Sequence, residues 1–240
     1  MKSVTALLLL SLLLSLLHPG VHAEQAAAED ARVSKNYTYD ARMAFLKAGE
    51  LNLALEREGD VYEVVGEFKT SRMMSTYYTW NGVFAAVGTW RGLGGPVTTA
   101  YMSKTSSKDD DLKIVLTYPD GTRVFDSETK EFETVERPGG IDLISALFFS
   151  PSCYSGTLVH DGEDNYHLIL MDEDVHGFNG GNQYFKGEVT SCDYRVIDHK
   201  DRKRRVIVSL AEIDGTQVAV QIRAKIPFLP DAIFRLRITP

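Results

Sequence analysis

The histidines are the first residues of this sequence that could do chemistry, because an imidazole can bind a metal ion or transfer a proton. His160 and His167 are seven residues apart, so a hairpin between them would bring their rings together. A metal ion would need further ligands, such as Asp172 or Glu173. The sequence has no compact metal-ligand motif. We therefore predict ordinary surface histidines and no metal site.

Ser145 and Asp142 are the second candidates, because a serine hydroxyl and a carboxylate both occur in acyl-transfer sites. Such a site also needs a histidine beside the serine, and nothing in the sequence indicates one. The chain also lacks the G-x-S-x-G elbow, a phosphate-binding loop and a dinucleotide fingerprint. We predict no catalytic residue and no cofactor, and we interpret Asp142 as a helix cap and Ser145 as a packing or hydrogen-bonding residue.

Aromatic and thioether side chains form the third candidate, a site for an apolar ligand. Ordinary core packing is one interpretation, because large aromatic residues dominate protein cores. The other is a cavity inside a curled sheet, since wide barrels hold a ligand and methionine adapts to varied shapes. The candidate cavity residues are Met73, Met74, Tyr77, Tyr78, Trp80, Phe84, Trp90, Phe148 and Phe149.

The first 23 residues have the pattern of an export signal. Lys2 gives a positive start, Ala6 to Leu17 is almost entirely apolar, and small residues precede a cleavage point near Ala23. The apolar run is shorter than the roughly 20 residues that a membrane-spanning helix needs. We predict a soluble protein of the periplasm rather than a membrane-spanning one.

Two cysteines, Cys153 and Cys192, follow the leader. An even number of cysteines in an oxidising compartment favours a disulfide. The alternative is a reactive or metal-binding pair of thiols, for which the sequence has neither a C-x-x-C motif nor a nearby histidine. We predict a structural disulfide.

The charge of the chain limits its partners. The formal net charge is −7, which disfavours non-specific binding to nucleic acid. One basic run, from Lys200 to Arg205, interrupts this acidity. We interpret that run as a solvated hairpin tip, and a contact with an anionic lipid or a polyanion is the alternative.

Alternation of apolar and polar residues indicates the fold, because it is typical of half-buried antiparallel strands. It predicts a hairpin of 37–45 and 51–57 that turns at Ala48-Gly49, and another that turns at Asp214-Gly215. Apolar residues at helical spacing predict one short helix within 139–149.

The strands together predict an all-β, mainly antiparallel protein. We expect a curled or open, barrel-like meander of about ten to thirteen strands, because a flat sheet of this length would leave a long edge exposed. A β-sandwich is the alternative. The predicted organisation is a leader at 1–23, a flexible lead-in at 24–36 and one β-rich domain at 37–240.

Several short motifs resemble a bacterial family of exported proteins called domain of unknown function 3108. The resemblance implies a β-rich envelope protein and makes lipid handling a reasonable expectation, as an analogy of fold. The sequence differs near its end, where this family often has a tryptophan-containing strand. The motifs are Tyr39 to Ala41, Ala48 to Glu50, Asp142 to Leu147, Cys153, Gly162, Tyr166, Cys192 and Pro227-Phe228.

Three functional hypotheses follow. The first is a non-enzymatic periplasmic protein that binds a lipid or other apolar ligand, or an envelope protein, and helps to maintain the cell envelope. The second is a protein-interaction scaffold with a filled core. The third is a hydrolase or metal enzyme whose site carries no familiar motif.

Overall fold

The strands in the described part of this chain belong to one meandering sheet. The computed structural model describes residues 32–76, 79–107, 112–125, 129–225 and 230–238. The predicted leader and all but the last five residues of the predicted lead-in lie outside these ranges. The first strand starts at Val33, four residues before the predicted domain start. No helix in the described ranges is long and apolar enough to span a bilayer.

The first eight strands pair in sequence order, each antiparallel to the next. Their apolar residues alternate with polar ones, and in the second strand Leu51, Leu53 and Leu55 are buried. The bounds are β1 Val33–Met43, β2 Leu46–Glu58, β3 Val61–Thr70, β4 Trp80–Trp90, β5 Pro96–Ser107, β6 Leu112–Tyr118, β7 Gly121–Phe125 and β8 Phe132–Val135.

The second half of the sheet returns to the first strand. The last strand pairs with β1, so the two halves join along the middle of the sheet. The bounds are β9 Ile141–Asp142, β10 Thr157–His160, β11 Asn165–Asn179, β12 Lys186–Asp198, β13 Lys203–Ile213, β14 Thr216–Lys225 and β15 Ala232–Leu236. All neighbours are antiparallel except β9 and β10.

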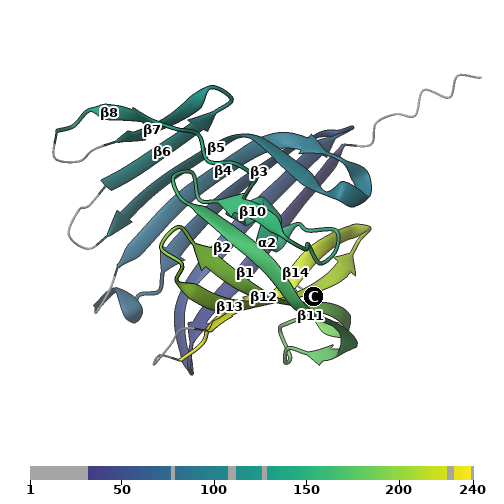
Figure 1. Cartoon of the computed structure of the whole chain (residues 1–240). Helices are drawn as coiled ribbons and strands as arrows, with labels where there is room; N and C mark the ends of the chain where they lie inside the picture. The colour runs from purple at the N-terminus through teal and green to yellow at the C-terminus, as the bar shows by residue number, and fades with distance from the viewer. Residues whose placement is uncertain (1–31, 77–78, 108–111, 126–128, 226–229, 239–240) are drawn as a thin grey trace, which may run out of the picture. The chain divides into compact units, whose positions relative to one another are not determined.

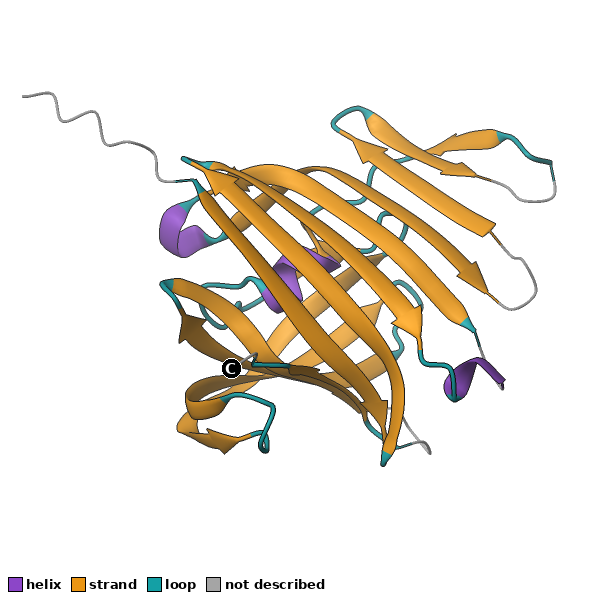
Figure 2. Ribbon diagram, turned by 180° about the vertical axis from the view of Figure 1, so that it is seen from behind, coloured by secondary structure: helices purple, strands orange, loops and turns teal. Residues whose placement is uncertain are grey.

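The sheet curls so that its two halves face each other across one short helix, α2 (Leu143–Phe148). Figure 1 and Figure 2 show α2 between β1–β5 on one side and β11–β14 on the other. Side chains from both halves therefore share one core, in which Tyr39 of β1 and Val208 of β13 are both buried. The remaining short helices are η1 (Met74–Thr76) and η2 (Gly92–Gly94).

The curled sheet remains open, because β8 and β9 are its two end strands and have no ladder between them. The prediction of an all-β, mainly antiparallel meander with one short helix is confirmed. The predicted strand number is too low, since the sheet has fifteen strands. Strands such as the two-residue β9 are too short to show the alternation of apolar and polar residues in the sequence. All fifteen strands lie in one sheet, so the described chain does not have the two sheets of a sandwich.

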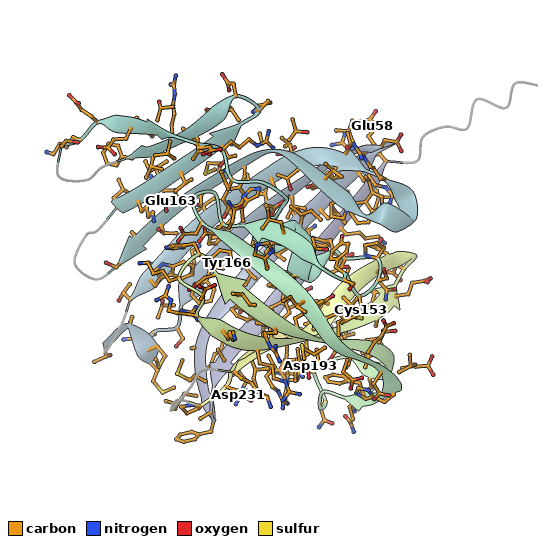
Figure 3. The ribbon with its side chains drawn as sticks, in the orientation of Figure 1. Glu58, Cys153, Glu163, Tyr166, Asp193 and Asp231 are labelled. Carbon is orange, nitrogen blue, oxygen red and sulfur yellow. A yellow bond between two sulfur atoms is a disulfide. The ribbon has the colours of Figure 1, made fainter. Side chains whose placement is uncertain are left out.

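A disulfide between Cys153 and Cys192 holds the segment after α2 against β12, with the two Cα atoms 5.4 Å apart. Cys153, labelled in Figure 3, lies between α2 and β10. Cys192 is fully buried in the shared core. The predicted pairing is therefore confirmed, and it fixes the helix segment to the half of the sheet that it covers.

Candidate functional site

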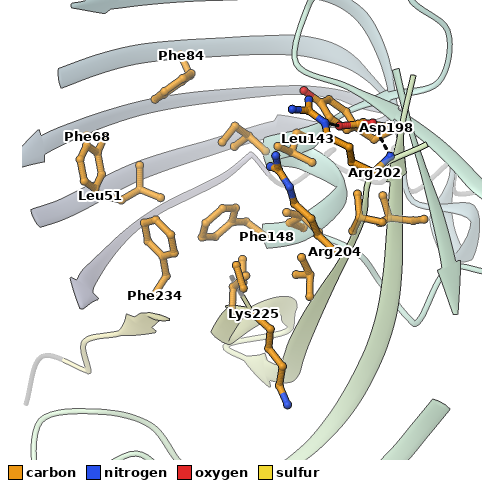
Figure 4. A pocket seen from close by; sticks show the side chains of 18 of the residues that line it. Leu51, Phe68, Phe84, Leu143, Phe148, Asp198, Arg202, Arg204, Lys225 and Phe234 are labelled. Carbon is orange, nitrogen blue, oxygen red and sulfur yellow. Dashed lines mark hydrogen bonds and ion pairs between the residues drawn. The ribbon is translucent and has the colours of Figure 1, made fainter. Parts of the chain in front are cut away.

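An open pocket of about 810 Å³ lies between the two halves of the sheet, beside α2 (Figure 4). We call it the apolar pocket, because most of its lining side chains are aliphatic or aromatic. The lining residues are Leu51, Phe68, Trp80, Phe84, Leu143, Ile144, Leu147, Phe148, Tyr166, Leu168, Val196, Asp198, Arg202, Lys203, Arg204, Val206, Ile222, Ala224, Lys225 and Phe234.

The helix α2 supplies one wall of the apolar pocket. Leu143, Ile144, Leu147 and Phe148 all line it, at the i, i+3, i+4 spacing that places residues on one face of a helix. The helix starts where Asp142 accepts a hydrogen bond from the Ser145 N–H at 2.9 Å. The predicted helix cap is therefore confirmed, and it orients the apolar face of α2 toward the pocket.

Aromatic rings close one end of the pocket. Phe68 lies 5.0 Å from Trp80 and 6.3 Å from Phe234, measured between ring centroids. Phe234 in turn lies 6.3 Å from Phe148 of α2. A Cβ atom at Gly49 would lie 2.5 Å from the Phe68 ring, so glycine is needed there for the ring to lie over β2. The rings thus connect β3, β4 and β15 to the helix.

Basic residues lie at the other side of the pocket, where the β12–β13 hairpin turns. We call Arg202, Lys203, Arg204 and Lys225 the basic mouth. Asp198 pairs with Arg202 at 2.6 Å and accepts the backbone N–H groups of Lys200 and Arg202. Burial alone would raise the pKa of Asp198, but these hydrogen bonds outweigh it and lower that pKa. The carboxylate stays ionised and holds the turn.

The candidate cavity residues have different positions. Trp80, Phe84 and Phe148 line the apolar pocket. Phe149 is buried outside it against Tyr37, with ring centroids 5.7 Å apart.

The other candidates do not line the pocket. Trp90 packs on Tyr62 at 6.1 Å and beneath Arg57. Met73 is half exposed near the end of β3, and Met74 begins η1 beside it. Tyr77 and Tyr78 lie outside the described residues.

Sequence reasoning missed several pocket residues. Phe68 and Phe234 carry no signal beyond ordinary strand alternation. The apolar face of α2 was detectable, since the helical spacing of its apolar residues is visible in the sequence. The basic run is a hairpin turn, as predicted, but Arg204 also lines the pocket, because it shares a strand face with Val206.

A second group of polar residues is enclosed behind α2 and does not line the pocket. Asp142 is bonded to Thr98, and the Tyr62 hydroxyl lies 3.3 Å from the Thr98 hydroxyl. All three are buried. Burial raises the pKa of Tyr62 further above its usual value, and the nearby Asp142 charge adds to this. The group braces the helix start against β5.

His160 corrects the prediction of surface histidines. It is fully buried, with its Nδ1 accepting the Gly162 N–H at 3.2 Å and its ring 5.8 Å from that of Tyr101. The strand pairing sets His160 opposite Asn165 and His167 opposite Leu158, and His167 is exposed. Within the described ranges, no three His, Cys, Asp or Glu residues are grouped so that they could hold a metal ion.

Comparisons with protein-family models, with curated proteins and with solved structures find no match for this chain. The resemblance to a family of exported proteins therefore stays a prediction. Function has to be argued from the pocket itself.

Proposed function

We propose that this chain is a non-enzymatic periplasmic protein that binds a lipid or other apolar ligand in the apolar pocket and so helps to maintain the cell envelope. The observation that carries the proposal is the pocket of about 810 Å³ with its aliphatic and aromatic walls. Ligand pockets typically measure about 300–1,000 Å³ and have mainly hydrophobic walls with a few polar groups.

The energetics favour an apolar occupant. Removing apolar surface from water gains about 25 cal/mol per Å². The acyl chain of a ligand that contacts the apolar face of α2 and the aromatic rings would therefore be stabilised along its length. The walls are held in place before binding. The disulfide fixes the segment after α2, and the Asp142 cap fixes the helix start. A preformed site loses little ordering entropy when it binds.

Neither alternative hypothesis has a specific observation in its favour. A scaffold would not need a pocket in its core, and the buried Asp142 carboxylate is bonded to the Thr98 hydroxyl and the Ser145 N–H. A protein partner remains as an outcome of the first experiment below.

The first experiment is native mass spectrometry of the mature chain purified from the periplasm, followed by extraction with organic solvent. We expect a stoichiometric adduct that extracts as a lipid. A clean mass of the mature chain, together with no uptake of added oleyl alcohol, would overturn the proposal and direct the search to a protein partner.

A pair of tryptophan variants locates the ligand. Ala224 lines the pocket, so Ala224→Trp should fill part of it and remove the adduct. Val65 is 41% exposed on the outer face of β3, so Val65→Trp adds the same side chain away from the pocket and should keep the adduct. Equal loading of the two variants would place the ligand elsewhere.

A further inference from the structure

We infer that the ligand is an anionic amphiphile, whose acyl chain lies in the apolar pocket and whose carboxylate or phosphate head is held at the basic mouth, chiefly by Arg204. This inference rests on the proposed function, because it specifies the ligand class of the same pocket. It is carried by the distribution of charge around the pocket and by the position of Arg204.

The pocket has an excess of positive charge that the rest of the chain lacks. Four basic residues and one acid, Asp198, line it, which leaves three positive charges without a compensating acid in the pocket. The whole chain has a formal net charge of −7. A local reversal of sign attracts an anion to this site and repels it from the rest of the surface.

Arg204 is the basic residue best placed to contact a ligand in the pocket. Its backbone pairs with Val196 across β12, and it is two residues from Val206 on β13, so all three side chains share one face of the sheet. Val196 and Val206 line the pocket as well. Figure 4 shows Arg204 extending from β13 on the pocket side, whereas the Lys225 side chain points away from the other labelled residues.

The guanidinium of Arg204 is available to a ligand. Its neighbour Arg202 is held by Asp198 at 2.6 Å, and Arg205 pairs with Asp193 on the outer face. For Arg204, the described residues provide no ion pair or hydrogen bond. A planar guanidinium can bind a carboxylate or a phosphate with two parallel hydrogen bonds. Lys203 and Lys225, at the rim, would add attraction without fixing an orientation.

The pocket is polar at one side and apolar at the other, as an amphiphile is. In Figure 4, Phe68, Phe84 and Phe234 lie on the side opposite Arg202 and Arg204. The aliphatic side chains of Val206, Ile222 and Ala224 line the pocket on the strands that carry the mouth. An acyl chain that lies along this surface toward the aromatic end leaves its head group beside Arg204.

The test compares three ligands with the same 18-carbon chain: oleate, 1-oleoyl lysophosphatidate and oleyl alcohol. Calorimetric titration of the mature protein, below the aggregation concentration of each ligand, gives the dissociation constants. Because a charged hydrogen-bond partner contributes substantially, we expect at least one anion to bind about tenfold or more tightly than the alcohol. This preference should shrink as salt is added, because salt screens exposed charges. The tighter anion identifies the head group as carboxylate or phosphate.

Two matched variants separate direct contact from general attraction. Arg204→Gln should remove the preference for the anion and leave the affinity for oleyl alcohol within about twofold. Arg123→Gln removes an equal charge from an exposed position of β7 that does not line the pocket, and it should keep the preference.

The outcomes distinguish the two proposals. Equal affinity of the wild-type protein for the alcohol and both anions, or an unchanged preference in Arg204→Gln, would overturn the anionic head group and leave the apolar pocket intact. Failure of all three ligands to bind would overturn the proposed function itself.

Discussion

Asp142 and Thr98 are joined by two hydrogen bonds where the end strand β9 lies against β5. The Thr98 hydroxyl donates to Asp142 Oδ2 at 2.6 Å and accepts the Asp142 N–H at 2.9 Å. Asp142 is the last residue of β9, which is an end strand of the sheet. Thr98 lies in β5, which already pairs with β4 and β6. The curl is therefore fixed by side-chain bonds rather than by a backbone ladder, and Asp142 begins α2 at the same point.

This relationship predicts that Thr98→Val destabilises the fold out of proportion to its small change in shape. The substitution removes a hydroxyl from a buried carboxylate and from a buried N–H, and an unsatisfied buried group costs about 1–3 kcal/mol. We expect a loss of about 2–3 kcal/mol in the free energy of unfolding, measured with denaturant. Thr99, its exposed neighbour, is the control, and Thr99→Val should change stability by less than about 0.5 kcal/mol. Similar losses in both variants would contradict the role of the bond.

The disulfide makes a second prediction. It joins residues 39 positions apart, and the chain-entropy model gives such a cross-link about 4 kcal/mol of stability. Cys153→Ser removes the bond at its half-buried end and leaves Cys192 packed in the core as a small apolar side chain. We expect a clearly lower melting temperature, and reduction of the wild-type protein should produce a similar decrease. Full thermal stability in Cys153→Ser, or two free thiols in protein from the periplasm, would refute the cross-link.

The turns show what sequence patterns could and could not predict. Asp214-Gly215 was predictable, because both residues have positive φ, which Asp tolerates and Gly favours. The predicted turn at Ala48-Gly49 is wrong, because β1 turns at Ala44-Phe45, with Ala44 at a φ of 52°. Gly49 is instead required by the Phe68 ring. A glycine that admits a distant ring and a glycine that makes a turn look the same in a sequence.

Prediction of the pocket from the sequence was limited in a similar way. Strand alternation places Trp80 and Phe84 on the same face of β4, and only the curl brings that face toward Phe148 of α2. The same curl makes Arg204 a pocket residue, although its sequence context is a charged hairpin. Local patterns determine which face a side chain shares with its neighbours, but the long-range return of β15 to β1 determines which faces meet.

The hydrogen bonds of Asp40 predict that the stability of the fold depends on pH. It is buried and accepts hydrogen bonds from Lys47, Tyr184 and Arg237. Burial alone would raise its pKa, but these partners outweigh it and lower the pKa below the ordinary value. A lowered pKa in the folded state gives stability that is complete above the unfolded pKa of about 4 and is lost as the pH falls through the folded value.

Asp40→Asn should therefore lose about 2 kcal/mol of unfolding free energy at pH 7, because hydrogen bonds to a charged group contribute about 1.5–3 kcal/mol. The difference from wild type should narrow as the pH falls below about 4, because the unfolded wild-type chain takes up a proton there, and it should be smallest below the lowered pKa of folded Asp40. Denaturant unfolding at several pH values measures both. Glu63→Gln, at an exposed site on β3, is the control and should leave the loss of stability at low pH unchanged. If Asp40→Asn differed from wild type by the same free energy at all pH values, Asp40 would not be the source of that loss.

His160 predicts a second pH dependence, nearer to neutrality. Burial lowers its pKa, and Arg137 adds to that effect, while the charges of Asp142 and Asp161 oppose it. The Gly162 N–H bond to Nδ1 places a lone pair on that nitrogen, so protonation there would break the bond. The unfolded chain binds a proton near pH 6.5, before the folded chain does. Stability is therefore complete above about pH 6.5 and falls, by up to about 1.4 kcal/mol per pH unit, until the folded pKa is reached.

His160→Asn tests this directly, because the amide oxygen of asparagine can replace Nδ1 as the acceptor for Gly162 but does not titrate. We expect lower stability than wild type at pH 7.5, from the lost contact with Tyr101, and a smaller decrease in stability between pH 7.5 and pH 5.5. His167→Asn removes an exposed histidine from the paired strand, and it should keep the wild-type decrease. If His160→Asn lost stability with falling pH as steeply as wild type, the buried imidazole would not be the source, because its substitute cannot take up a proton in that range.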